Sequence, residues 1–240
     1  MIALTLPLLL LQQDKPAETQ QTPGQFLSKV IFRYAEAKTI QGSFKCVSTA
    51  NGLRVEVNSA VAIERPSKVY LRQVRGGAVP EDTVITSDGK KFSYDAPIEL
   101  KNTRGERLME FVWKEGAKAP MSVGEVVQIG QQRLPDYSAP LWLMMSYRID
   151  LEFLRGCWGK VAWQQESNGL LSVGGTYKEY PLATEAGTWQ LWATPEGDLK
   201  RYALSVPIVE GGRQITVSNV WTIDVKLNAE VAPETFKLKF

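Results

Sequence analysis

Apolar side chains between residues 24 and 38 recur at the spacing of an amphipathic helix. The apolar positions are Phe26, Leu27, Val30, Ile31, Tyr34 and Ala37. Charged side chains such as Lys29, Arg33 and Glu36 lie between them and fall on the opposite face. Because one face of this helix is apolar, we expect it to lie on a hydrophobic surface formed by the residues that follow.

A hairpin is predicted directly after the helix. Residues 40–50 and 53–64 have the character of strands and flank Asn51-Gly52, the strongest short hairpin signal. Apolar residues of the second strand alternate with polar ones, and they are Leu53, Val55, Val57, Val61 and Ile63. This alternation predicts a sheet with one apolar face and one wet face.

More strands are predicted on both sides of a helical region. The predicted strands are 68–75, 83–86 and 90–94, with a turn at Ser87-Asp88-Gly89, and later 160–165, 170–178, 188–194, 199–207 and 213–226. Between residues 105 and 155 the hydrophobic period changes from two to about 3.6, which predicts helices near Trp113 and over residues 139–154. The expected fold class is α+β, a curved antiparallel sheet covered by a few helices, in one domain from residue 25 to residue 240.

An apolar run at residues 2–11 precedes a polar segment rich in Gln, Thr and Pro. The run has the length of a signal-peptide core and is too short to span a bilayer. No basic residue precedes it and no clear cleavage site follows it. Residues 1–24 are therefore predicted to be a signal peptide or an uncleaved apolar anchor, with a linker. We expect an exported protein of the periplasm or cell envelope.

Composition narrows the classes of function. The chain has 28 Lys and Arg against 26 Asp and Glu, a net charge of +2, and no long run of like charge. Nucleic acid is therefore not an expected partner. Histidine, the commonest metal ligand and general base, is absent. No phosphate loop, zinc pattern or dinucleotide fingerprint occurs, so we expect no metal and no cofactor. We also expect a monomer.

The chain contains two cysteines, Cys46 and Cys157. They are too few for a Cys-rich zinc site and lie far apart in the sequence. Two interpretations stay open: a long-range disulfide, which export would favour, or two buried free thiols that behave as small apolar residues.

No motif of the sequence predicts catalysis. Ser87 and Lys90 have the Ser-x-x-Lys spacing of serine acylating enzymes, but Asp88-Gly89 between them forms a turn where the enzymes have a helix. The carboxylates show no paired spacing for acid and base work. We therefore expect a protein that is not an enzyme.

Several short motifs together resemble one family. They are the Asn51-Gly52 hairpin after the helix, Glu64-Arg65-Pro66, Ser87-Asp88-Gly89 with Phe92-Ser93-Tyr94-Asp95, Thr188-Trp189-Gln190-Leu191-Trp192, Lys200-Arg201-Tyr202, Val220-Trp221 and Pro233-Glu234-Thr235-Phe236. In this order they resemble the LolA/LolB-like periplasmic lipoprotein carriers, and are similar to an uncharacterised branch of that superfamily. The resemblance covers most of the chain after residue 24.

The resemblance implies a half-barrel of antiparallel strands, closed by helices around an apolar cavity that receives the acyl chains of lipoproteins. The sequence departs from the carriers at the arginine that locks their lid. Arg65 is expected to point outward from its strand, and Arg72 is the remaining candidate.

We therefore predict an exported carrier that shields a lipid, or the acyl chain of a lipoprotein, from water. The residues predicted to line its cavity are Phe44, Val57, Leu71, Trp113, Trp142, Met145 and Trp192. In a regular strand Trp189 and Trp192 fall on opposite faces, so at least one of them should meet solvent, a helix or a ligand. A register error of one residue would reverse the face of any of these assignments. The alternative is an envelope protein-interaction or sensor domain with a filled core and no ligand.

Overall fold

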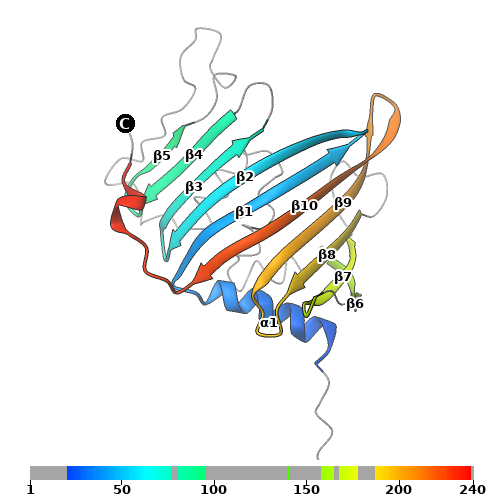
Figure 1. Ribbon diagram of the computed structural model, residues 1–240, viewed down its shortest axis with the longest axis horizontal. Coiled ribbons are helices and arrows are strands. Elements are labelled where there is room, and N and C mark those ends of the chain that lie inside the picture. Colours follow the sequence, from blue (N-terminus) through cyan, green and yellow to red (C-terminus); the bar gives the residue numbers. More distant parts are fainter. Residues whose placement is uncertain are drawn as a thin grey trace, which may run out of the picture.

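The computed structural model describes residues 21–76, 81–95, 140, 158–164, 168–177 and 187–238 (Figure 1). Helix α1 (Pro23–Ala35) begins after Thr22, whose Oγ1 accepts a hydrogen bond from the backbone N–H of Gln25 at 3.3 Å. The Gln25 side chain accepts a hydrogen bond in return from the backbone N–H of Thr22 at 2.8 Å. This capping box satisfies N–H groups that have no partner inside the helix. The predicted helix is thus confirmed.

Ten strands form one antiparallel sheet in the described part of the chain. They are β1 (Thr39–Ala50), β2 (Leu53–Glu64), β3 (Lys68–Arg75), β4 (Glu81–Asp88), β5 (Phe92–Asp95), β6 (Trp158–Trp163), β7 (Leu171–Tyr177), β8 (Gly187–Ala193), β9 (Leu199–Glu210) and β10 (Arg213–Leu227). Their order across the sheet is β5-β4-β3-β2-β1-β10-β9-β8-β7-β6. Pairing of β1 with β10 joins the first five strands to the last five, and the sheet does not close on itself.

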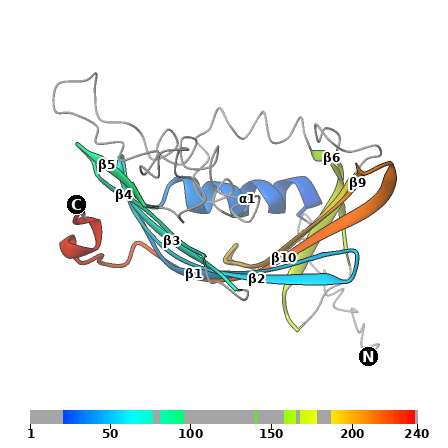
Figure 2. The same cartoon turned by 90° about the horizontal axis from the view of Figure 1, so that it is seen from above.

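The sheet curves around α1, which lies on its concave side (Figure 2). The buried face of the helix packs on the concave face of the sheet, which we define as the face that carries Phe44, Val57 and Trp221. Asp198, in the turn between β8 and β9, forms an ion pair with Arg33 of α1 at 2.7 Å. The backbone N–H of Leu199 donates to the Tyr34 hydroxyl at 2.8 Å. These contacts fix the helix across one end of the strands.

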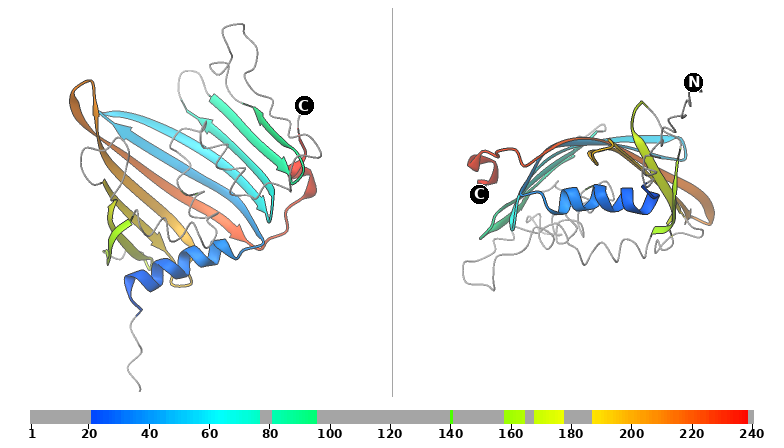
Figure 3. Two further views of the ribbon diagram at one scale, coloured as in Figure 1. Left: turned by 180° about the vertical axis from the view of Figure 1, so that it is seen from behind. Right: turned by 90° about the horizontal axis from the view of Figure 1, so that it is seen from below.

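A second, smaller cluster lies on the opposite, outer face. After β10 the chain crosses to that face and ends its described part with the short 3-10 helix η3 (Pro233–Phe236), which lies on the other side of the sheet from α1 (Figure 3). Val231 and Phe236 bury Ala62 there and pack against Tyr70. The C-terminal segment therefore covers one end of the outer face of β2 and β3, and leaves its middle uncovered by η3.

The sequence predicted the curved antiparallel sheet and its strands, with small shifts at their ends. β4 extends to Asp88 and β5 begins at Phe92, so the turn lies two residues later than predicted. The described residues contain one α-helix where a few were expected. The helices predicted near Trp113 and over residues 139–154 lie outside the described residues, apart from the single residue Pro140.

Arg65 was expected to point outward from its strand, and the structure shows that it does not. Its guanidinium donates to the backbone oxygens of Ala37 at 2.9 Å and Tyr34 at 3.0 Å, at the C-terminal end of α1. The last carbonyls of a helix lack partners and carry partial negative charge, so a cation is favourable there. Arg65 has the parity of Val61 and Ile63, which face inward, so the alternation of β2 continues through this residue and the expectation of an outward side chain was wrong.

We expect Arg65→Met to lower the free energy of unfolding by about 2 kcal/mol, because two charge-assisted hydrogen bonds to buried carbonyls are lost. The control is Arg54→Met, whose ion pair with Glu56 is at the surface, with 62% of the Arg54 side chain exposed. That change should cost less than about 1 kcal/mol. Urea unfolding followed by tryptophan fluorescence measures both, and equal losses would contradict the role of Arg65.

Candidate functional site

The concave face is the most extensive apolar surface of the described residues. Its buried side chains come from strands on both halves of the sheet, and include Phe44, Val57, Val61, Leu71, Ile85, Val173, Trp189, Leu191, Tyr202, Trp221 and Ile223. Three residues predicted to line a cavity, Phe44, Val57 and Leu71, lie on this face and are at most 2% exposed. Because strand side chains alternate, their neighbours along the chain face outward.

Trp192 lies on the outer face, contrary to the prediction. Along β8 the buried positions are Trp189, Leu191 and Ala193, while Trp192 is half-buried on the other side. There the Arg201 guanidinium carbon lies 4.6 Å from the centre of its ring, a cation–π contact. Trp189 is therefore the inward-facing tryptophan of this strand. The remaining predicted lining residues, Trp113, Trp142 and Met145, lie outside the described residues.

Cys46 carries a free thiol that is fully buried on the concave face. At Cys46 the structure therefore agrees with the second interpretation, a buried free thiol. Cys157 lies outside the described residues. Burial raises the pKa of Cys46 to about 12. A thiol that stays protonated and enclosed is a poor nucleophile.

Ser87 lies in β4 and Lys90 in the turn that follows, so the pair belongs to the hairpin of β4 and β5. The Ser87 hydroxyl donates to the backbone oxygen of Ser67 at 2.9 Å. One carboxylate oxygen of Asp88 accepts from the backbone N–H groups of Lys90 and Lys91, each at 2.7 Å. These side chains stabilise the turn between β4 and β5.

Polar side chains interrupt the concave face at several places, two of which were not predicted from the sequence. The Gln73 amide donates to the Ser59 hydroxyl at 3.1 Å between β3 and β2. Asn219 of β10 lies opposite Ser48 of β1. Asn219 and Ser48 are 6% and 9% exposed. The signal that identifies Asn219 is its position in a strand whose other inward residues are apolar.

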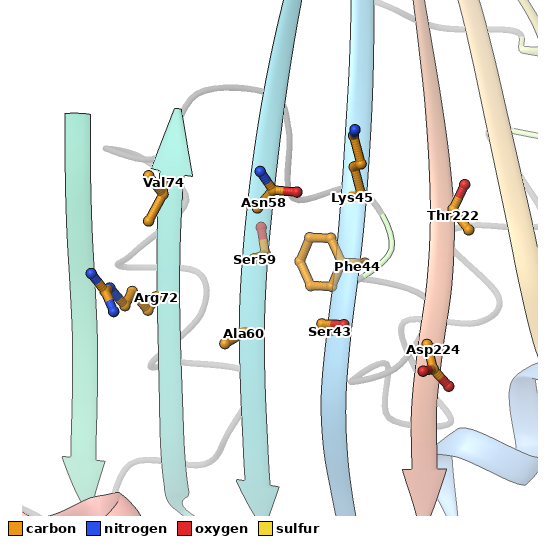
Figure 4. Close-up of a pocket in the computed structure, with 10 residues that line it drawn as sticks. All are labelled: Ser43, Phe44, Lys45, Asn58, Ser59, Ala60, Arg72, Val74, Thr222 and Asp224. Atoms are coloured by element: carbon orange, nitrogen blue, oxygen red, sulfur yellow. The ribbon is translucent and has the colours of Figure 1, made fainter. Parts of the chain in front are cut away.

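A hollow of about 480 Å³ opens on the outer face of β3, β2, β1 and β10 (Figure 4). Its lining residues are Ser43, Phe44, Lys45, Asn58, Ser59, Ala60, Arg72, Val74, Thr222 and Asp224. Arg72 reaches Asp82 at 3.0 Å, and Lys45 forms an ion pair with Glu56 at 2.6 Å. Hydrogen bonds from Lys45 and Arg54 hold the pKa of Glu56 below its usual range. Both cations that border the hollow are thus paired with carboxylates. Arg72 was the remaining candidate for the arginine that locks the lid in the carriers. It lies on this outer face, on the other side of the sheet from the apolar concave face.

The described residues contain no group of three or more Cys, Asp or Glu side chains arranged to hold a metal ion. Within the same ranges, no helix is long and apolar enough to cross a membrane.

Solved structures with a similar fold include the MucA/MucB complex of Pseudomonas aeruginosa, at 15% identity and a TM-score of 0.44, with 90% of this chain and 61% of that chain covered. LprF of Mycobacterium bovis is similar at 15% identity and a TM-score of 0.40, over 88% of this chain and 94% of that one. A LolA superfamily protein of Nitrosomonas europaea is also among the neighbours. Its identity is 8% and its TM-score 0.35, over 90% of this chain and 98% of that one.

The chain spans 61% of the length of the MucB chain. No protein-family model and no curated protein matches it. These similarities identify no ligand or partner for this chain.

Proposed function

We propose that this chain is an exported binding protein that holds an acyl chain on the concave face of its sheet and shields it from water. The observation that carries the proposal is the apolar concave face itself. Strands from both halves of an open sheet contribute aliphatic and aromatic side chains to it, and α1 fastens at one end of these strands. The apolar run at residues 2–11 supports export to the periplasm or cell envelope.

Burial of methylene groups supplies the affinity in this proposal. Each methylene removed from water contributes about 0.8 kcal/mol, and ordering the chain opposes part of this gain. Lengthening a ligand by two methylenes should therefore tighten binding by about tenfold until the face is filled. Phe44, Val57 and Leu71 are the proposed lining residues in the described part of the chain, together with Trp113, Trp142 and Met145 outside it.

The first test is native mass spectrometry of the protein purified from an envelope fraction, followed by titration with saturated fatty acids of 10 to 16 carbons. We expect a bound lipid or acylated peptide at near one-to-one occupancy, and a dissociation constant that falls by about tenfold per two methylenes. Clean apoprotein that binds no fatty acid of any length would overturn the proposal.

Two adjacent residues of β2 provide matched variants for this titration. Ser59 is buried on the concave face, whereas Ala60 is exposed on the outer face and lines the hollow there. Ser59→Phe adds a ring on the proposed binding side, so it should weaken binding of the 16-carbon acid. Ala60→Phe adds the same ring on the other side and should leave binding unchanged. Circular dichroism of both variants establishes that they are folded.

A second candidate is an envelope protein-interaction domain, which the outer hollow favours. A hollow bordered by paired charges and floored by small side chains suits a polypeptide better than a lipid. If Ala60→Phe abolishes capture of an envelope protein while Ser59→Phe does not, and no fatty acid binds, this candidate replaces the carrier.

A further inference from the structure

One polar residue interrupts the inward-facing row of β10. The other inward residues of this strand are Ile215, Val217, Trp221, Ile223, Val225 and Leu227. Asn219 stands between Val217 and Trp221 in that row. Asparagine is unfavourable both in strands and in apolar surroundings. Its presence therefore requires a compensating interaction.

The structure does not provide that interaction within the described residues. Asn219 is 6% exposed, so water has little access to it, and its Oδ1 atom accepts no hydrogen bond. Its cross-strand neighbours on the same face are Ser48 of β1 and Leu204 of β9. A buried carbonyl oxygen without a donor is destabilising, and few such groups occur in a folded protein.

The other polar pair of this face is joined by a hydrogen bond. The Ser59 hydroxyl receives it from the Gln73 amide N–H, across β2 and β3. Asn219 lies on β10, beyond β1 from that pair. Its oxygen accepts no hydrogen bond from the described residues, so it is an acceptor on the concave face that can receive a donor from a bound molecule.

We propose that Asn219 Oδ1 accepts a hydrogen bond from the head of the bound lipid, and that this head carries an N–H or O–H donor directly at the end of the hydrocarbon chain. This inference rests on the proposed function, since it names the class of ligand for the same face. An acyl amide or a long-chain alcohol provides such a donor. A methyl ester or an ether provides acceptors alone and leaves Asn219 without a partner.

The test compares pairs of ligands that differ in the donor. N-methyl hexadecanamide and methyl hexadecanoate have the same chain and nearly the same shape, but only the amide has an N–H group. Hexadecanol and its methyl ether form the corresponding O–H pair. In at least one pair, we expect the wild-type protein to bind the ligand that has the donor about tenfold more tightly than the ligand that lacks it. The pair that shows the larger ratio identifies whether an amide or a hydroxyl is preferred.

Asn219→Leu removes the acceptor and keeps the size of the side chain, so the donor ratio should fall to about one while affinity for the methyl ester is kept or improved. The control is Asn58→Leu, an exposed asparagine on the outer face, which should keep the wild-type ratio. As a second readout, Asn219→Leu should raise the thermal unfolding midpoint without ligand, because an unpaired buried carbonyl is removed.

The outcomes separate this inference from the proposed function. If affinity rises with chain length but the wild-type protein binds amide and ester equally, and alcohol and ether equally, the role of Asn219 is wrong and the carrier stands. A donor preference that persists in Asn219→Leu would also overturn it. If no ligand of either pair binds, the carrier itself fails.

Discussion

Gly42→Ala should cost about 3–5 kcal/mol of unfolding free energy, a large part of the stability of an ordinary protein. Gly42 lies in β1 at the centre of the sheet, opposite Val225 of β10. An added Cβ would collide with the backbone oxygen of Asp224 and lie 2.7 Å from the Cα of Val225. Its φ of 153° is also one that residues with side chains rarely adopt.

The cost is large because backbone atoms of the neighbouring strand cannot rotate away as a side chain would. To admit a methyl group, β1 and β10 must separate where the two halves of the sheet join. Glycine in the interior of a strand often marks such a close approach or bend. The hydrogen bonds on both sides of Gly42 would weaken together.

Thermal and urea unfolding of Gly42→Ala measure the effect, and Gly24→Ala is the control. Gly24 lies in the first turn of α1, where an added Cβ meets nothing within 4 Å. Because alanine favours a helix more than glycine does, Gly24→Ala should stabilise the protein by up to about 1 kcal/mol. A Gly42→Ala variant with wild-type stability would show that the two strands can separate without loss.

Much of the fold was predictable because local patterns encode it. Asn51 and Gly52 have positive φ values of 49° and 78°, the backbone geometry for which the Asn-Gly turn is favoured. Alternation in β2 placed Val57, Val61 and Ile63 on one face, and all three are buried. The helical spacing of residues 24–38 likewise found α1. In each case the information lies within fifteen or fewer consecutive residues.

The pairing that completes the sheet was not predictable in this way. β1 and β10 are separated by more than half of the chain, and no local pattern states that Cys46 lies opposite Trp221. Without that register, Asn219 could not be placed beside Ser48. Alternation along β8 predicts that Trp189 and Trp192 lie on opposite faces of the sheet, but it does not predict which of them faces inward.

We expect the protein to lose most of its stability between pH 9 and pH 12. Burial raises the pKa of the Cys46 thiol from 9.0 to about 12. Burial likewise raises the pKa of the Tyr34 hydroxyl from 10.0 to about 12, despite the hydrogen bond from Leu199 that opposes this shift. In this range the unfolded chain releases protons that the folded chain retains. The free energy of unfolding must therefore fall as the pH rises, and the contribution is complete below the unfolded pKa values.

The magnitude follows from the shifts, since each pKa unit corresponds to about 1.4 kcal/mol. By pH 12, Cys46 should account for a loss of roughly 4 kcal/mol and Tyr34 for roughly 2 kcal/mol. Together these losses approach the whole stability of many domains. Cys46 lies on β1 and Tyr34 on α1, so the alkaline transition should release both the sheet and the helix that covers it.

Urea midpoints of wild type, Cys46→Ala and Tyr34→Phe, measured with a reductant from pH 8 to pH 11, test this prediction. Both variants start lower at pH 8, because Cys46→Ala leaves a small cavity and Tyr34→Phe leaves the Leu199 N–H unpaired. Their stability should nevertheless fall less steeply with pH than that of the wild type. A Cys46→Ala variant that loses as much stability as the wild type over this range would show that the buried thiol does not govern the alkaline limb.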